Sequence, residues 1–451
     1  MAHYHDTIAA LATPAGTSAL AVLRISGPDT SRLAQELGGG APPPRQAGRA
    51  DYRDRAGALV DDVLVTFFRG PASYTGEDVL EISCHGNPFI AQRILEDLLA
   101  RGCRAAQPGE FTQRAFLNGR MDLSQAEAVM DLIHARSERA LTAANQQLRG
   151  ALGRYLGELT EGLLAVLARI EAYIDFPEED LPAEDQKQLQ ADLERLITNT
   201  KRLLATSHYG EVLRDGMKTV ILGLPNSGKS LLLNRLLGKD RALVSAEPGT
   251  TRDYLEERII IGPHSLRLID TAGINPTPAP LEKLGMEKTM ERAEEADLIL
   301  LVIDSAQPAP QFPENLISCL AQARTLVVGN KSDLPPHGDL AGTYAGYELV
   351  KVSALTSEGL EQLQDAIVRR AEAFSVTLGA EIIAINARHA DALGRARTCL
   401  ESSVEKLQHH EASELVASEL RGALEAFGEI SGKIDNEKML DRLFATFCIG
   451  K

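Results

Sequence analysis

The spacing of apolar residues changes along the chain, and each change suggests a boundary. In residues 1–118 the apolar residues form short runs bounded by Gly, Pro and Asp, which predicts strands. The clearest runs are "ALAVLRIS" (19–26), "DVLVTFF" (62–68) and "VLEISCHG" (79–86). The stretch "GGGAPPPRQAGRADYRDRAG" (38–57) is so rich in Gly and Pro that we expect a loop without regular structure. This segment is predicted to be a mixed domain of the α+β type.

The next segment, residues 119–215, has the three- and four-residue spacing of helices. Ser124 and Glu127 form a candidate capping box for its first helix. One long helix is expected to bury a stripe made of Leu148, Leu152, Tyr155, Leu159, Leu163, Val166, Ile170 and Tyr173. The acidic, proline-containing "DFPEEDLP" (175–182) ends it, and a further helix carries Leu189, Leu193, Leu196 and Leu203.

Apolar runs alternate with helical stretches in residues 216–377, which predicts a doubly wound, largely parallel sheet. The runs are "MKTVILG", "ERIIIG", "LRLIDTAG", "ADLILLVID" and "RTLVVGNKSD". Helical spacing returns in residues 378–451. Helical segments on both sides favour insertion of the α/β unit into a helical domain over a separate C-terminal bundle. At the end of the chain, Leu440, Leu443, Phe444 and Phe447 have helical spacing and are expected to hold the tail in place.

Composition supports a globular, helix-rich protein of two to four domains. The 451 residues are 44% hydrophobic and 24% charged, while aromatic residues make up 4% and Trp is absent, which disfavours a β-sandwich. The net charge of −16 excludes a general nucleic-acid-binding protein. Contact with RNA would require a local basic patch or a basic partner.

The cysteines indicate a reducing compartment. There are five, Cys84, Cys103, Cys319, Cys399 and Cys448, and they are widely spaced without a CxxC pair. The first residues have neither the basic nor the apolar segment of a signal peptide, and no apolar run has the length of a membrane span. We therefore expect a cytoplasmic protein that does not enter a membrane.

A phosphate-binding loop follows the first strand of the α/β unit. "GLPNSGKS" (223–230) matches the G-x-x-x-x-G-K-[ST] pattern. Gly223 and Gly228 allow backbone N–H groups to surround the phosphates, Lys229 reaches the β- and γ-phosphates, and the Ser230 hydroxyl suits Mg²⁺. A chance match is improbable, because strand, loop and helix occur in the required order.

Three further motifs follow predicted strands and point to guanine nucleotides. "DTAG" (270–273) offers Asp270 as a carboxylate that binds magnesium directly or through water, and Gly273 near the γ-phosphate. In "NKSD" (330–333), Asp333 can accept hydrogen bonds from both N1–H and the exocyclic amine of guanine, whereas adenine lacks this pair of donors. "SAL" (353–355) completes the base pocket. Together the motifs predict a GTPase.

The predicted GTP site and its hydrolytic groups extend over several loops. Thr251 in "EPGTTRD" (247–253) is the expected switch threonine for Mg²⁺. Ile274 stands where Ras-like proteins carry the glutamine that positions water, so another group must do so. Glu282 could orient this water or be a solvated charge, and Arg252 could be an arginine finger or a surface ion pair. The predicted GTP-binding residues are Asn226, Ser227, Gly228, Lys229, Ser230, Leu231, Ser245, Thr250, Thr251, Asp270, Thr271, Ala272, Gly273, Asn330, Lys331, Asp333, Ser353, Ala354 and Leu355.

Phrases along the whole chain resemble the MnmE (TrmE) family of bacterial tRNA-modification GTPases. They are "DTIAALATPAG", "LRISGP", "TGEDVLEISCHG", "PGEFTQRAFLNGRMDLSQAEAV", "IDFPEED", the GTPase motifs and the terminal "FCIGK". The resemblance implies an N-terminal folate-binding and dimerisation domain (1–118), a helical domain in two parts (119–215 and 378–451), and an inserted Ras-like P-loop GTPase domain (216–377).

The resemblance also implies partners and chemistry. Family members act with an FAD-dependent partner, MnmG (GidA), in a heterotetramer or larger complex. Together they build a 5-carboxymethylaminomethyl or related aminomethyl group on the wobble uridine (U34) of tRNAs. A 5-formyl- or 5,10-methylene-tetrahydrofolate supplies the one-carbon unit. The resemblance further implies a homodimer through the N-terminal domain, transient dimerisation of the GTPase domains and acceleration of hydrolysis by K⁺.

Individual residues match the motifs of the family. Asn226 matches a K⁺-coordinating asparagine, and the backbone around Ser245, Glu247 and Thr250 matches the loop that completes the K⁺ shell. The resemblance makes Glu282 the first choice for the group that orients water. It implies folate contacts for Arg24, Glu81, Arg120 and the terminal Lys451, and it places Cys448 beside that site, as a nucleophile or a packed thiol.

The chain departs from the family in two places. Position 120 is Arg where the family frequently has lysine, and Asn275 stands where the family often has arginine. The alternative functions are an Era-like ribosome-assembly GTPase and a regulatory switch that takes no part in the modification chemistry.

Overall fold

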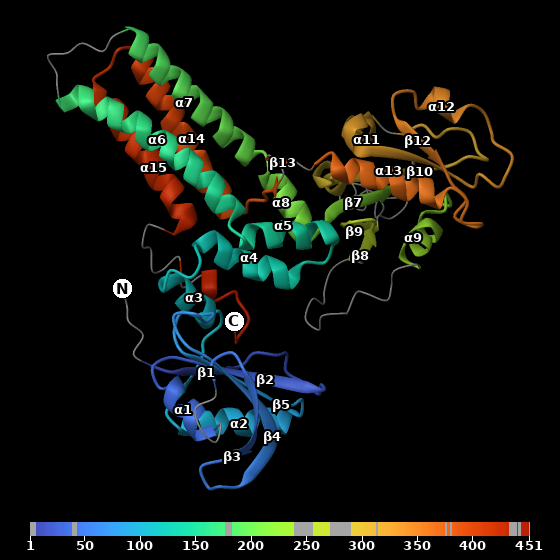
Figure 1. The fold of residues 1–451 in the computed structure, drawn as a ribbon. Helices are drawn as coiled ribbons and strands as arrows, with labels where there is room; N and C mark the ends of the chain where they lie inside the picture. Colours follow the sequence, from blue (N-terminus) through green and yellow to red (C-terminus); the bar gives the residue numbers. More distant parts are fainter. Residues whose placement is uncertain are drawn as a thin grey trace. The chain divides into compact units, whose positions relative to one another are not determined.

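The computed structural model describes residues 6–37, 43–175, 183–238, 256–270, 290–312, 314–374, 377–378, 381–432, 440 and 443–450 (Figure 1). The chain forms two compact units. The first, called the N-terminal unit here, comprises Met1–Met130 and Phe427–Lys451, and the second, the larger unit, comprises Asp131–Ala426. The finer division at residues 118, 215 and 377 stays a prediction.

A six-stranded sheet, in the order β3-β4-β5-β2-β1-β6, forms the N-terminal unit. Its strands are β1 (Ile8–Leu11), β2 (Leu20–Ser26), β3 (Ala47–Arg53), β4 (Leu59–Phe68), β5 (Val79–His85) and β6 (Arg104–Ala105). Helices α1 (Thr30–Leu37) and α2 (Pro88–Ala100) contribute Leu33 and Ile94 to the core that covers one face, with Leu23 and Ile82 from the sheet. The alternate positions of β2 and β5 are therefore free to carry polar side chains on the other face.

The expectation of an irregular loop over residues 38–57 is wrong in part, because Ala47–Arg53 forms β3. This strand pairs antiparallel with β4, from Ala47 opposite Thr66 to Arg53 opposite Leu59. A tight turn connects the two strands, in which the Asp54 N–H donates to the Ala58 carbonyl (3.0 Å) and Gly57 has a φ of 81°. The long strand β4 offers a free edge, and pairing with it outweighs the weak strand propensity of β3.

Helices α3 (Glu110–Leu117) and α4 (Leu123–His134) follow the sheet. The capping residues of α4 differ from those predicted. The Asp122 carboxylate accepts from the Gln125 N–H (2.8 Å), and the Gln125 side chain accepts from the Asp122 N–H (2.9 Å). Because the helix starts before the predicted pair, Ser124 and Glu127 are buried inside it.

The C-terminal tail packs within the N-terminal unit. Leu440, Phe444 and Phe447 are buried against Leu123 and Ala126, which confirms the predicted apolar stripe. The N–H of Gly109 donates to the carbonyl of Cys448 (3.2 Å). The tail is thus held by side chains and backbone, while the Cys448 side chain itself is exposed.

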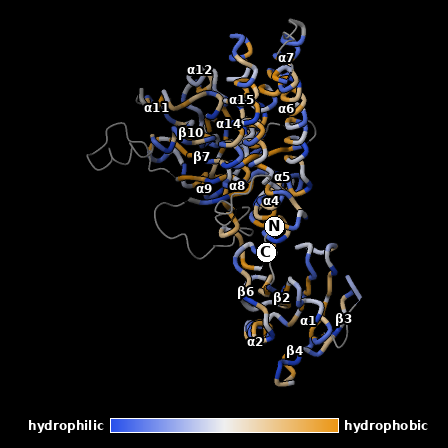
Figure 2. The backbone as a smooth tube through the Cα atoms, turned by 90° about the vertical axis from the view of Figure 1, so that its left-hand side faces the viewer, coloured by the Kyte–Doolittle hydropathy of each residue, from blue (hydrophilic) through white to orange (hydrophobic). Residues whose placement is uncertain are grey.

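Four long helices lie side by side in the larger unit (Figure 1). They are α6 (Ala151–Asp175), α7 (Ala183–Leu204), α14 (Ala387–Gln408) and the part of α15 (Ser413–Ser431) up to Ala426, where this unit ends. The Gln186 side chain donates to the Leu407 carbonyl (3.0 Å), and Lys201 pairs with Glu401 (2.8 Å), so helices from both sides of the α/β segment meet. The α/β segment is therefore inserted into a helical domain, as predicted. In Figure 2 the helices alternate between hydrophobic and hydrophilic positions.

The predicted single helix from Leu148 onward is wrong at its start. Leu148 is the last residue of α5 (Glu138–Leu148), and α6 begins at Ala151. Gly150 has a φ of 83°, a left-handed conformation that ends α5. The apolar spacing is nearly unchanged across this two-residue break, which is why the pattern suggested one helix. None of the helices in the described ranges is long and apolar enough to cross a membrane.

The inserted segment contains a six-stranded sheet in the order β12-β11-β10-β7-β9-β8, and all neighbours are parallel except β8 and β9. Its strands are β7 (Met217–Leu222), β8 (Glu256–Ile261), β9 (His264–Asp270), β10 (Leu298–Asp304), β11 (Thr325–Asn330) and β12 (Glu348–Lys351). Successive residues of β10 alternate between two cores, with Leu298 and Leu300 in one and Ile299 and Leu301 in the other. The predicted doubly wound sheet is confirmed.

Helices cover both faces of this sheet. Helices α9 (Lys229–Leu237) and α13 (Leu360–Glu372) share one core with α5 and α8 (Ser207–Asp215), and α11 (Glu314–Cys319) and α12 (Leu340–Thr343) contribute to the other. A short 3-10 helix (Gln322–Arg324) precedes β11, and a small ribbon of β13 (Thr377–Leu378) and β14 (Glu381–Ile382) leads to α14.

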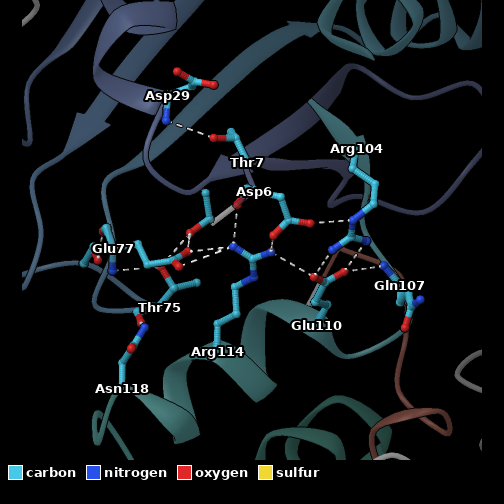
Figure 3. Close-up of polar contacts among 12 residues, drawn as sticks. Asp6, Thr7, Asp29, Thr75, Glu77, Arg104, Gln107, Glu110, Arg114 and Asn118 are labelled. Carbon is cyan, nitrogen blue, oxygen red and sulfur yellow. Dashed lines mark hydrogen bonds and ion pairs between the residues drawn. The ribbon is translucent and has the colours of Figure 1, made fainter. Parts of the chain in front are cut away.

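A buried arginine organises the N-terminal unit (Figure 3). The Arg114 side chain on α3 is completely buried, and its guanidinium pairs with Asp6 (2.8 Å), Glu110 (3.0 Å) and Glu77 (3.3 Å). Arg104 adds a second cation, paired with Asp6 (2.7 Å) and Glu110 (2.5 Å). These contacts tie the start of β1, the segment before β5, β6 and α3 to one another.

The charges of this cluster are well compensated. Burial raises the pKa of Glu110, but hydrogen bonds from Arg104, the Gln107 N–H and Arg114 outweigh this effect and hold the pKa below its ordinary value. Since the pKa is lowered on folding, the ionised carboxylate stabilises the unit above the ordinary pKa of Glu. That contribution is lost as the pH falls through the lowered value.

Substitution of this arginine should destabilise the N-terminal unit. We expect Arg114→Met to lower its free energy of unfolding by about 3 kcal/mol, because the buried Glu110 and the half-buried Glu77 each lose a paired cation. Hydrogen exchange of peptides from α3, measured at increasing urea concentration, reports this change. Arg49→Met is the control, because Arg49 pairs with Asp62 on the exposed sheet edge and should leave exchange nearly unchanged. Equal effects of the two substitutions would contradict the role of Arg114.

Candidate functional site

The loop between β7 and α9 depends on glycine at two positions. Gly223 has a φ of 154°, and a Cβ there would lie 2.3 Å from the Val302 carbonyl oxygen. Gly228 has a φ of 92°, and a Cβ there would lie 2.2 Å from the Asn330 amide nitrogen. Asn226 is also left-handed, with a φ of 61°, a conformation that Asn tolerates better than most residues. The loop therefore has the curvature needed for backbone N–H groups to surround an anion.

The loop itself holds its lysine in place. Lys229 is 8% exposed, and its ammonium group donates to the carbonyls of Gly223 (3.0 Å) and Leu224 (2.9 Å). Ser230 is exposed in the first turn of α9. The N-terminus of this helix and the lysine offer hydrogen-bond donors to phosphates, and the exposed Ser230 hydroxyl offers an oxygen to a magnesium ion.

Asn330, at the end of β11, joins the phosphate loop to a second loop. This residue is 1% exposed. Its amide nitrogen donates to the Ser227 carbonyl (2.8 Å), and its amide oxygen accepts from the Ala354 N–H (3.0 Å). Both ends of the side chain are thus used to bring the loops after β7 and β12 together.

The carboxylate of Asp333 is exposed and oriented by a neighbour. The Ser353 hydroxyl, which is buried, donates to the Asp333 carboxylate (2.6 Å). Lys331, with a φ of 62°, pairs with Asp304 at the end of β10 (2.7 Å). The arrangement leaves a carboxylate able to accept two hydrogen bonds from a planar base.

The phosphate loop and the Asp333 carboxylate lie at the same edge of the sheet. β7, β10, β11 and β12 are parallel neighbours, so the loops at their carboxyl ends converge. The structure therefore brings together the predicted residues of three motifs, namely those at 226–231, 330–333 and 353–355. β9, the parallel neighbour of β7 on its other side, ends at Asp270.

Several predicted site residues lie outside the described residues. They are Ser245, Glu247, Thr250, Thr251, Arg252, Thr271, Ala272, Gly273, Ile274, Asn275, Glu282 and Lys451.

A second group of predicted residues meets in the N-terminal unit. Arg24 on β2 lies opposite Glu81 on β5, and its guanidinium bonds the carboxylate through Nε (2.9 Å) and a terminal nitrogen (2.8 Å). Another terminal nitrogen donates to the carbonyl of Gly450 in the tail (3.2 Å). The guanidinium carbon also lies 5.5 Å from the Tyr74 ring centre and 5.8 Å from that of Phe111.

Arg120 and Cys448 lie in the same unit as Arg24 and Glu81. The Arg120 N–H donates to the Ala115 carbonyl (2.9 Å), and a Cβ at Gly76 would lie 3.3 Å from its Cγ atom, so Arg120 runs along the loop that carries Tyr74. Cys448 is exposed near the end of the tail. The structure gives no direct contact among Arg24, Arg120 and Cys448 within the described residues.

Three contributors to these sites were not predicted from the sequence. Tyr74 and Phe111 flank Arg24, and Asp304 holds Lys331. Asp304 ends the apolar run "LILLVID", and this position could have marked it as a site residue, because the carboxyl ends of parallel strands carry functional groups. Nothing in the local pattern marks the two aromatic residues, because they come from a loop and from α3.

Comparison with known proteins covers the whole chain. The family model described as GTP-binding protein TrmE N-terminus matches residues 7–120, and the MnmE helical domain model matches residues 123–448. A tRNA modification GTPase MnmE of Opitutus terrae is 58% identical over 447 residues, which are 99% of each chain. Proteins with the same name from Akkermansia muciniphila and Symbiobacterium thermophilum are 45% and 42% identical, again over 99% of each chain.

A comparison with solved structures matches part of the chain. The G domain of the T. maritima FeoB iron transporter is 28% identical, with a TM-score of 0.27, over 34% of this chain and 98% of that one. The match of the N-terminal model, the match of the helical model and the full-length relatives agree in one assignment. The chain belongs to the family of tRNA modification GTPases named MnmE.

Proposed function

We propose that this GTPase binds GTP in the inserted domain and uses its hydrolysis in the modification of the wobble uridine of tRNA. The observation that carries the proposal is the convergence of the phosphate loop and the base loops on the amide of Asn330, in a chain with full-length MnmE relatives. The FAD-dependent MnmG protein is the proposed partner, and tRNA is the proposed substrate.

Each part of the nucleotide has a proposed contact. Lys229 would leave the loop carbonyls for the β- and γ-phosphates, and Ser230 would bind Mg²⁺ together with Thr251. Asp333 would accept from N1–H and the amine of guanine, in the orientation supported by Ser353. Asp270 would support the magnesium ion, directly or through water.

Hydrolysis is proposed to use a bound K⁺ ion in place of an arginine finger. The exposed, left-handed Asn226 would offer a side-chain oxygen, and the backbone near Ser245, Glu247 and Thr250 would complete the ion's shell. A cation at this place would stabilise the charge that develops between the phosphates. Glu282 is the proposed group that orients the attacking water.

A tetrahydrofolate site is proposed around Arg24 and Glu81. The carboxylate of Glu81 can accept from the donors of a pterin ring, and the guanidinium of Arg24, flanked by two aromatic rings, can meet a carbonyl or carboxylate. Arg120 and Lys451 would contact the remainder of the cofactor. Cys448 is the proposed nucleophile toward the uridine or the one-carbon unit, with a packed thiol as the alternative.

The proposed assembly is a homodimer formed through the N-terminal unit, with transient pairing of the GTPase domains. The face of the sheet opposite α1 and α2 carries exposed apolar residues, among them Leu64, which is 48% exposed. Such a face suits a protein partner. The proposed location is the cytoplasm, in line with five free cysteines.

The Era-like alternative is not supported, because the N-terminal and helical family models together match residues from 7 to 448. The regulatory-switch alternative differs from the proposal in chemistry, since a switch needs neither folate nor a nucleophile.

Restoration of the modified uridine in cells tests the function as a whole. In a bacterial strain that lacks its own MnmE, the chain should restore the wobble modification of bulk tRNA, measured by nucleoside mass spectrometry. Lys229→Ala should fail, because the phosphate loop loses its ammonium group, whereas Arg49→Ala at the exposed sheet edge should succeed. Failure of the expressed wild-type chain would refute the proposal.

The rate of GTP hydrolysis should depend on the monovalent cation. We expect turnover to rise several-fold in KCl over NaCl, because only the larger ion fits the proposed shell, and Asn226→Ala should lose this dependence. Glu282→Ala should abolish turnover with little change in GDP affinity. Equal rates of the wild type in the two salts would eliminate the K⁺ mechanism.

Folate binding should be measurable without the partner. Calorimetric titration with 5-formyltetrahydrofolate is expected to show binding that Arg24→Lys weakens, because a lysine cannot replace the paired guanidinium contacts. Arg32→Lys is the control, since Arg32 is an exposed residue of α1 that pairs with Glu36. The absence of heat at high micromolar ligand would leave the folate assignment without support.

A further inference from the structure

The second loop of the nucleotide site has an anchor outside the recognised motifs. Arg235 lies in the last turn of α9. Its Nε donates to the Ala354 carbonyl (3.0 Å), and a terminal nitrogen donates to the Leu355 carbonyl (2.9 Å). One guanidinium therefore holds two successive carbonyls of the loop after β12.

These two carbonyls belong to the segment that orients the groups proposed to bind guanine. The Ala354 N–H donates to the Asn330 side chain, and the Ser353 hydroxyl donates to Asp333. Both contacts depend on where the backbone of residues 353–355 lies. A displacement of this backbone would turn Asn330 and Asp333 away from the base together.

The same helix begins at the phosphates. Lys229 and Ser230 occupy the first turn of α9, and Arg235 occupies the last. The helix is nine residues long and packs into the core through Leu232 and Leu236, so it is a rigid connection. Of the two residues whose carbonyls Arg235 binds, Ala354 is buried and Leu355 is exposed. Charge-assisted hydrogen bonds of this kind are among the stronger ones.

We infer that Arg235 is a positioning residue for guanine recognition, which sets the distance between the phosphate end and the base end of the nucleotide site. It touches neither the base nor the phosphates itself. Its planar, forked guanidinium suits two neighbouring carbonyls, which a lysine could not bind at once. This inference rests on the proposed guanine contact of Asp333.

The sequence gives no hint of this role. In "KSLLLNRLL" (229–237) Arg235 stands on the exposed side of an amphipathic helix, where an arginine is ordinarily a solvated charge. Only the fold brings the carbonyls of the loop after β12 within hydrogen-bonding distance of Arg235.

Nucleotide binding by Arg235→Gln tests the inference on the full chain. We expect the dissociation constant of a fluorescent GDP to rise by about 5- to 10-fold, since two charge-assisted hydrogen bonds to the base loop are lost. Arg235→Lys should lie between this variant and the wild type. Inorganic tripolyphosphate, which lacks a base, should compete with GDP for the phosphate loop. Its inhibition constants for the wild type and for Arg235→Gln should agree within about twofold, because the phosphate loop is unchanged. The kcat at saturating GTP should also be unchanged.

Two variants separate this role from general damage and from a wrong site. Arg324→Gln is the matched control, because Arg324 also donates to carbonyls, those of Glu294, Ala296 and Cys319, but before β11 and thus at the opposite end of the strand. It should bind GDP like the wild type. Asp333→Asn should weaken GDP binding strongly.

The outcomes are distinguishable. If Asp333→Asn weakens GDP binding and Arg235→Gln does not, the inference is overturned and the guanine site stands. If Arg235→Gln weakens tripolyphosphate binding as much as GDP binding, the role of Arg235 is merely structural and the inference also fails. The same holds if Arg324→Gln weakens GDP binding as much as Arg235→Gln does. If Asp333→Asn binds GDP normally, the proposed guanine site itself is wrong.

Discussion

The buried amide of Asn330 is the interaction on which the nucleotide site depends. Parallel strands deliver their loops to one edge of the sheet, but proximity alone leaves flexible loops without a defined separation. A side chain that donates to the phosphate loop and accepts from the loop after β12 removes this freedom. Because the amide is 1% exposed, no water competes for either bond. Gly228 is required for the same contact, since a Cβ there would meet the amide nitrogen.

The N-terminal unit also depends on ion pairs, and one of them lies on the sheet face opposite α1 and α2. Arg24 and Glu81 are neighbours across β2 and β5, and the tail adds a carbonyl to the same guanidinium. In the same unit, Arg114 and Arg104 neutralise the carboxylates that hold β1, β6 and α3 together. A buried guanidinium with several carboxylate partners tolerates little movement, so it defines the position of the segments from which Tyr74 and Phe111 extend.

Much of this architecture could be predicted from the sequence, because local patterns carried it. Helical spacing over 189–203 and apolar runs at 217–222 and 298–304 correspond to α7, β7 and β10. The motif residues of the nucleotide site also follow the strands to which they were assigned. Errors arose where a neighbour in space decided the outcome. β3 forms because β4 offers an edge, and Asp122 rather than Ser124 caps α4 because the helix starts two residues earlier than predicted.

The sequence by itself determined which segments are strands and helices, and which residue types could bind phosphates, magnesium and guanine. These properties depend on spacing along the chain and on the chemistry of single side chains. The tertiary structure alone decided which distant groups meet, such as Arg235 with the loop at 354–355, Arg24 with the tail, and Arg114 with Asp6. Such contacts join residues separated by many positions, and a hydrogen bond forms only where folding brings donor and acceptor to about 3 Å. The spacing of residue types along the chain does not determine that distance.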